Sequence, residues 1–111
     1  MFVTLIRADE LPGGGKDDVV QALNEMAADL DGKDVRGFRQ AYLLRGEKGN
    51  AIALAMWDSP QDAEQFMRSE HGQKAAKRQD KAFGGKARKE RYQVTWRAKF
   101  SDRGGVEPET P

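Results

Sequence analysis

The chain contains no cysteine and a single histidine among its 111 residues. The missing thiols exclude disulfides, thiolate metal sites and a cysteine nucleophile together. One histidine, with no distinctive spacing of carboxylates, gives no support for a metal site. The glycines at 13–15 lack the Lys-Ser/Thr pair of a phosphate-binding P-loop. No residue pattern therefore points by itself to a reaction.

The sequence also lacks an excess of either charge and any long apolar run. Nineteen Lys and Arg against eighteen Asp and Glu leave a formal net charge of +1, so no global field favours DNA or an anionic membrane. Residues 1–7 carry neither a basic region nor a long apolar segment, so we expect no signal peptide and no membrane span. We expect one cytoplasmic domain with a single modest core, and neither nucleic acid nor membrane as a partner.

Hydrophobic spacing predicts strands and helices in the first half of the chain. Residues 2–8 are β-branched and apolar, which is typical of a short strand. Apolar positions at i, i+4, i+7, i+8 and i+11 over residues 19–30 predict a helix. Residues 36–45 and 51–57 flank the turn at 47–50 and so predict a hairpin.

A helix start follows the apolar run that ends at Trp57. Ser59 has the properties of an N-cap, Pro60 fits the first helical position, and Asp62 stands three residues after the cap. Trp57 is either part of a catalytic pocket or an anchor where strand meets helix. Its large apolar area favours the anchor.

The second half completes a β-α-β-β-α-β order. A basic helical segment is expected over residues 72–82 and a last strand over 91–98. Residues 101–111 are rich in Gly, Pro and acidic side chains, which predicts a disordered tail after a domain at 1–100. The order predicts an α+β, ferredoxin-like fold, βαββαβ, in which a four-stranded antiparallel sheet carries the helices on one face.

The strand at 51–57 predicts a partner for the other face. Its sequence, AIALAMW, offers apolar side chains to both faces, whereas a face open to water normally alternates with polar residues. A second copy is the simplest cover, so we expect a homodimer through the sheet face. The alternative is that one or two long side chains shield a monomer.

Three segments resemble the antibiotic biosynthesis monooxygenase superfamily: Gly37-Phe38, Tyr42-Leu-Leu-Arg45 and Trp57-Asp-Ser-Pro-Gln-Asp-Ala-Glu-Gln-Phe66. The resemblance runs from Met1 to about residue 100 and implies a dimeric α+β barrel. The superfamily contains cofactor-free oxygenases of polycyclic aromatics and quinols, as well as heme-degrading enzymes and uncharacterised members. It therefore implies a monooxygenase without fixing the substrate.

The layout is most similar to the heme-degrading branch, with its Pro-Gly-rich turn after the first strand. That branch uses an Asn, a Trp and an axial His, and these places fall on Arg7, Phe66 and approximately Lys77. None of the three matches, and a protonated Lys offers no lone pair to iron. His71 is the remaining candidate ligand for a heme, with a solvated helix end as the alternative.

The resemblance favours oxygenation without a cofactor, in a cleft between sheet and helices. Such a reaction needs a dry aromatic pocket and a cation or base. Arg7 is the candidate catalytic residue if its row, shared with Val3 and Leu5, faces that cleft; otherwise the strand has reached solvent there. The residues expected to bind substrate are Phe66, Tyr42, Lys77, His71 and Trp96, and those expected to be structural are Trp57 and Ser59. For the aromatic residues, a place in the core is the alternative.

Eight basic residues crowd into 74–91. They suit an anionic ligand guided toward the cleft, or form only a solvated face. Nucleic acid would require interleaved aromatic residues as stacking platforms, and few are near. Two further functions remain alternatives: a heme-binding or heme-degrading relative with altered ligands, and a non-catalytic dimeric module that binds a small aromatic or anionic molecule.

Overall fold

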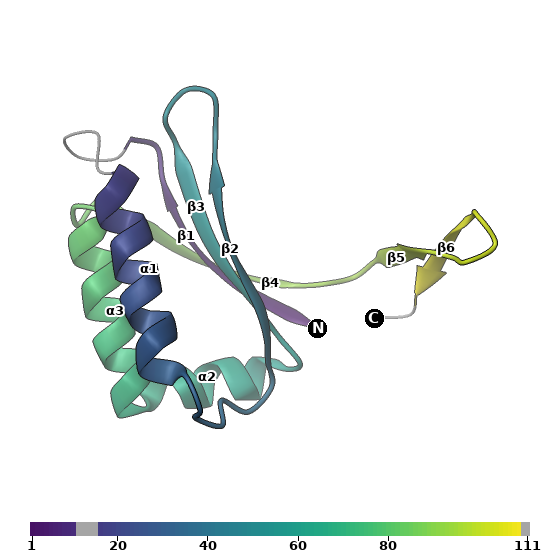
Figure 1. Ribbon diagram of the computed structural model, residues 1–111, viewed down its shortest axis with the longest axis horizontal. Helices are drawn as coiled ribbons and strands as arrows, with labels where there is room; N and C mark the ends of the chain where they lie inside the picture. The colour runs from purple at the N-terminus through teal and green to yellow at the C-terminus, as the bar shows by residue number, and fades with distance from the viewer. Residues whose placement is uncertain (11–15, 110–111) are drawn as a thin grey trace.

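The chain forms a four-stranded sheet covered on one side by helices (Figure 1). The computed structural model describes residues 1–10 and 16–109, so the Pro-Gly-rich turn predicted after the first strand lies outside the described residues. The elements in chain order are β1 (Phe2–Ala8), α1 (Lys16–Leu30), β2 (Phe38–Arg45), β3 (Ala51–Trp57), α2 (Pro60–Arg68), α3 (Glu70–Ala82), β4 (Arg88–Gln93), β5 (Arg97–Phe100) and β6 (Val106–Glu109).

The sheet has the strand order β2-β3-β1-β4, and every neighbouring pair is antiparallel. This confirms the α+β, ferredoxin-like arrangement that the sequence predicts. Among the described residues, no helix is long and apolar enough to cross a membrane.

The second helical region divides at Ser69 into α2 and α3. The Ser69 hydroxyl donates to the Phe66 carbonyl at 2.6 Å and accepts the Gly72 N–H at 3.0 Å, so one side chain caps both helices. A Cβ on Gly72 would lie 1.8 Å from the Phe66 carbonyl oxygen, so only glycine fits there. The basic helix predicted at 72–82 therefore begins earlier, at Glu70.

The predicted last strand, 91–98, is wrong at both ends. β4 begins at Arg88, and its pairing with β1 ends at Gln93, opposite Phe2. The Val94 N–H donates to the Met1 carbonyl at 2.9 Å as the last bond to the sheet.

Residues 94–109, here termed the arm, run away from the body and end in the two-stranded sheet β5–β6 (Figure 1). The predicted tail at 101–111 is thus partly a hairpin. Its turn closes through the Ser101 N–H, which donates to the Gly105 carbonyl at 2.7 Å, and Gly104 adopts a φ of 85°. Local turn bonds and strand pairing provide the order that its composition did not predict.

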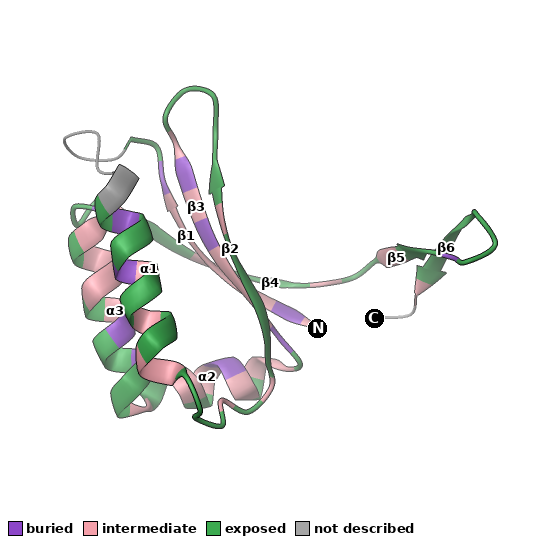
Figure 2. Ribbon diagram, viewed as in Figure 1, coloured by how far each residue is buried: buried purple, intermediate pink, exposed green. Residues whose placement is uncertain are grey.

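The face of the sheet under the helices carries the core. Small side chains of the sheet, Ala8, Ala51 and Ala53, leave room for Val19 of α1 and for Phe83 just after α3. A second buried cluster joins Phe2, Trp57 and Ala63. Figure 2 shows buried positions along β1 and β3 and on the helices. Alternating alanines in β3 therefore mark the helix side of the sheet.

The opposite face, here termed the open face, is covered by no element of the described chain. Register places alternate residues of all four strands on it. They are Gln40, Tyr42 and Leu44 of β2, Ile52, Leu54 and Met56 of β3, Val3, Leu5 and Arg7 of β1, and Arg88, Glu90 and Tyr92 of β4. The centre of this face is apolar, whereas its β4 edge is charged.

Candidate functional site

Arg7 lies on the open face, directed away from the helices. Its neighbours Ile6 and Ala8 occupy the helix-side core, so strand alternation turns Arg7 to the other side. Its Nε donates to Oε1 of Glu90 at 2.7 Å, and the Tyr92 hydroxyl donates to Oε2 at 2.8 Å. The bond from Arg7, and then that from Tyr92, lowers the pKa of Glu90. The expected place of Arg7 in a cleft beneath the helices is therefore corrected.

Four of the expected substrate-binding residues do not meet. Tyr42 is on the open face, where its hydroxyl donates to Gln40 Oε1 at 2.7 Å. Trp96 is on the arm and is 66% exposed. His71 stands exposed in the first turn of α3, and Lys77 is exposed further along that helix. The chain does not gather these four side chains into one pocket.

Trp57 anchors the corner between β3 and α2. Its side chain is 3% exposed, and its Nε1–H donates to the Thr4 hydroxyl at 3.1 Å. The ring lies edge-on to Phe38 and tilted against Phe66, each with centroids 5.4 Å apart. Phe66 of α2, expected to bind substrate, thus packs against the buried cluster on the helix side of the sheet.

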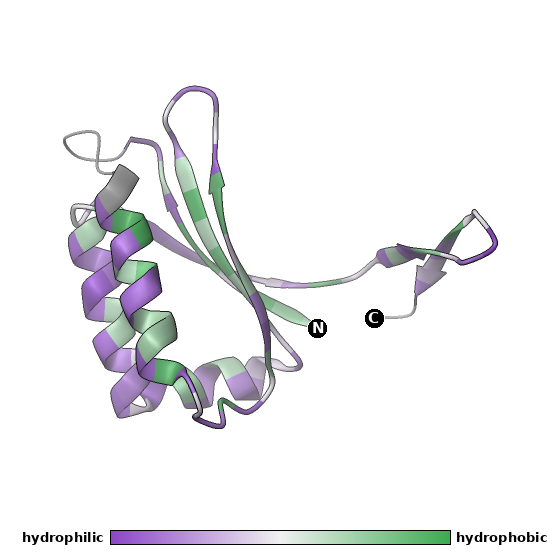
Figure 3. Ribbon diagram, in the orientation of Figure 1, coloured by the Kyte–Doolittle hydropathy of each residue, from purple (hydrophilic) through white to green (hydrophobic). Residues whose placement is uncertain are grey.

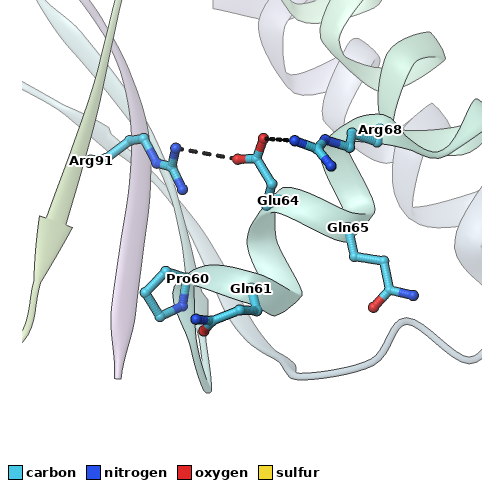
Figure 4. A pocket seen from close by; sticks show the side chains of 6 residues that line it. All are labelled: Pro60, Gln61, Glu64, Gln65, Arg68 and Arg91. Carbon is cyan, nitrogen blue, oxygen red and sulfur yellow. Dashed lines mark ion pairs between the residues drawn. The ribbon is translucent and has the colours of Figure 1, made fainter.

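A hollow of about 470 Å³, here termed the α2–β4 hollow, opens between the helix layer and the edge of the sheet (Figure 4). It is lined by Pro60, Gln61, Glu64, Gln65, Arg68 and Arg91. The helix that supplies most of this lining starts at the Ser59 cap, whose hydroxyl accepts the Asp62 N–H at 3.1 Å. The Ser59 cap and the packing of Trp57 against Ala63 together fix the position of α2 beside the sheet.

Two guanidinium groups converge on one carboxylate in this hollow. Glu64 lies 3.3 Å from Nη1 of Arg91 and 3.3 Å from Nη2 of Arg68 (Figure 4). Arg91 pairs with Thr4 in the sheet register and therefore points to the helix side. Its guanidinium sits over the Phe2 ring, 5.0 Å from the centroid. The hollow thus carries two guanidinium groups against one carboxylate, an excess of one positive charge.

The basic segment 74–91 is largely neutralised. Five of its eight basic residues form ion pairs with acidic side chains. Only Arg91 of this segment lines the α2–β4 hollow. The other basic residues of the segment are therefore better explained as a solvated surface.

The residues of the hollow do not fit the axial ligation of a heme. Its lining offers no imidazole and no thiolate. His71 and Lys77 are exposed on α3 and line neither this hollow nor the larger one near Met1. Among the residues that the structure describes, no group of three His, Asp or Glu is placed to hold a metal ion.

Sequence reasoning missed Glu64 and counted Arg91 only as part of a basic segment. Both belong to the hollow because the fold brings α2 within ion-pair distance of β4, which no local pattern specifies. A signal was nevertheless present for Arg91: successive side chains of a strand point to opposite faces, so Arg91 and Tyr92 must lie on different sides of the sheet.

Sheet order, helix layer and hollow together define a ferredoxin-like α+β domain with a charged opening beside α2. No protein-family model and no curated protein matches the sequence. Solved structures do match. SnoaB, a cofactor-independent oxygenase from Streptomyces nogalater, superposes with a TM-score of 0.60 at 14% identity, over 84% of this chain and 92% of that chain.

Two further solved structures superpose on this chain. A candidate antibiotic biosynthesis monooxygenase from Bordetella bronchiseptica gives a TM-score of 0.66 at 14% identity, over 84% of this chain and 96% of that one. Rv0793 from Mycobacterium tuberculosis gives 0.62 at 13%, over 85% and 95%. The chain therefore has the fold of the antibiotic biosynthesis monooxygenases, as the resemblance in its sequence implied. Identities this low establish the fold alone.

Proposed function

We propose that this protein is a small monooxygenase that oxidises an aromatic or quinol-type molecule without a bound metal, flavin or heme. The observation that carries the proposal is the pair of guanidinium groups, Arg68 and Arg91, that meet at the α2–β4 hollow. A volume of about 470 Å³ suits a ligand of a few fused rings. The fold shared with SnoaB supports the same kind of chemistry.

The substrate itself is the reductant in this scheme. A polycyclic phenol or anthrone loses a proton to become an electron-rich anion, and Glu64 is the carboxylate in the lining that can accept this proton. The guanidinium of Arg91 then stabilises the developing oxyanion. Dioxygen takes electrons from the anion and bonds to its carbon. For a CH2 carbon, one oxygen atom stays as a carbonyl and the other leaves as water with both hydrogens.

The experiment is dioxygen uptake with anthrone as the probe. Protein treated with EDTA is expected to consume one dioxygen per anthrone, with anthraquinone and water as products. EDTA leaves this rate unchanged because no metal takes part. An uptake rate equal to that of anthrone alone contradicts the oxygenase proposal and leaves the non-catalytic binding module. A saturable shift of the hemin Soret band, lost in His71→Ala, favours the heme alternative instead.

We further propose that the open face is covered by a second copy, as its apolar centre favours. Eight of its residues are hydrophobic or aromatic, and they come from all four strands. A cytoplasmic location is proposed as well, since a chain without cysteine needs no oxidising compartment.

A further inference from the structure

A second hollow, of about 620 Å³, lies where the arm leaves the body and is here termed the arm-base hollow. It shares no lining residue with the α2–β4 hollow. Its lining consists of Met1, Arg39, Gln40, Met56 and Asp58 of the body and Arg97 of β5. The hollow is therefore a separate candidate site, built from both the body and the arm.

An irregularity in β2 brings two adjacent polar side chains to this hollow. Phe38 and Gln40 pair with successive residues of β3, so Arg39 between them is an extra residue. A bulge of this kind bends its strand and redirects a side chain. Arg39 and Gln40 consequently both line the hollow, although they are neighbours in one strand.

The lining holds more hydrogen-bond donors than side-chain oxygens to accept them. Each guanidinium group carries five N–H donors, and the hollow has two such groups. The Asp58 carboxylate already accepts from Arg39, and Oε1 of Gln40 already accepts from the Tyr42 hydroxyl. The hollow is thus suited to a ligand that brings acceptor oxygens.

One of these donors is buried without a partner. The Nε of Arg97 has no hydrogen-bond partner among the described residues, although its Nη2 lies 3.5 Å from Glu109. Buried donors in folded proteins are nearly always satisfied by protein or by ordered water. The Arg97 Nε–H therefore calls for an acceptor from outside the described chain.

Two methionine side chains give the hollow an apolar part. Met1 precedes β1 and Met56 is in β3, and Figure 3 shows hydrophobic residues along both strands. Methionine is flexible and adapts to ligands of different shape. A volume of about 620 Å³ is in the range of small-molecule sites. A ligand with an apolar body as well as an anionic group matches both parts of this lining.

We propose that the arm-base hollow binds an organic monocarboxylate, whose carboxylate accepts from the guanidinium groups of Arg97 and Arg39. Its apolar body lies against Met1 and Met56. A carboxylate is favoured because its two coplanar oxygens match the planar fork of a guanidinium. Since Arg97 belongs to the arm and Arg39 to β2, the bound ligand joins the arm to the body. The proposal does not depend on the oxygenase activity proposed above.

The test uses octanoate as the probe and the full-length protein. Isothermal titration calorimetry measures the dissociation constant. Acrylamide quenching of tryptophan fluorescence reports chiefly on Trp96, which adjoins Arg97 and is 66% exposed, because Trp57 is 3% exposed. Quenching is expected to fall saturably as octanoate binds and holds the arm.

Two variants remove the proposed donors one at a time. Arg97→Gln and, separately, Arg39→Gln are each expected to weaken octanoate binding by about 10-fold or more, because each removes a charged donor. The second variant lies in the body, so its result does not depend on the Arg97–Glu109 ion pair of the hairpin. Arg103→Gln is the matched control, since it makes the same change at an exposed position of the arm outside the lining.

The neutral analogue octanamide separates recognition of the carboxylate from burial of the chain. It is expected to bind wild type at least ~10-fold more weakly than octanoate does. Equal binding of the two compounds, or equal octanoate affinity in wild type, Arg97→Gln and Arg39→Gln, overturns the proposal. So does an absence of saturable binding to wild type. An octanoate affinity that falls as the protein concentration rises assigns the hollow to a second copy of the chain and overturns it as well.

Discussion

Replacing Trp57 with alanine is expected to destabilise the fold by about 3–5 kcal/mol, as truncation of a buried tryptophan does. The ring is 3% exposed and contacts Phe38 and Phe66 from two different elements. A domain of this size has about 5–15 kcal/mol of stability, so much of the fold's reserve disappears. Urea unfolding followed by circular dichroism measures the change.

The matched control removes only the polar contact of the indole. Thr4→Val deletes the hydroxyl that accepts the Trp57 Nε1–H and leaves the ring packing in place. Its cost is expected to be about 1–3 kcal/mol, the range for one buried donor left unpaired. A Trp57→Ala loss below that of Thr4→Val contradicts the assignment of Trp57 as the anchor of this corner.

Replacing Arg91 with glutamine is expected to weaken binding of 1-hydroxy-2-naphthoate to the α2–β4 hollow by about 10–100-fold. Hydrogen bonds to a charged group contribute about 1.5–3 kcal/mol, and each 1.4 kcal/mol is tenfold in affinity. Arg91 is held over the Phe2 ring and faces the hollow, so its guanidinium is positioned for an anion. Isothermal titration calorimetry measures the dissociation constants.

Arg7→Gln is the matched control, because it removes the same charge from the opposite face of the sheet. Its affinity for the naphthoate is expected to equal that of wild type. The neutral analogue 1-hydroxy-2-naphthamide is expected to bind wild type and Arg91→Gln alike, since it lacks the carboxylate. A loss of affinity in Arg7→Gln with none in Arg91→Gln would return the site to the open face.

Local signals in the sequence were enough to predict that Trp57 lies where a strand ends and a helix begins. An apolar run, a Ser cap and a proline at the first helical position are adjacent in the chain, and the structure has that cap. The prediction that Val3, Leu5 and Arg7 share one face of the first strand was also correct. The sequence left open which side of the sheet this row faces. The helices cover the face that carries the small residues Ala51 and Ala53, so the row lies on the opposite face.

The α2–β4 hollow could not be predicted from the sequence, because residues far apart in the chain form it. Glu64 of α2 and Arg91 of β4 form an ion pair only in the folded chain, and their spacing in the sequence does not predict that contact. The arm was missed for a related reason. Its strands are held by turn bonds at Ser101 and by pairing between β5 and β6, in a segment whose composition is typical of a tail.

We propose that ligand binds on the helix side of the sheet, at the α2–β4 hollow. The most direct measurement is nuclear magnetic resonance of isotope-labelled protein during titration with 1-hydroxy-2-naphthoate. Binding at this hollow is expected to give saturable shifts of the backbone amides at 61–68 and of the Arg91 Nε–H, with the methyl groups of Ile52 and Leu54 on the open face unchanged. Saturable shifts of those methyl groups and of the Arg7 Nε–H, with α2 unchanged, would contradict it.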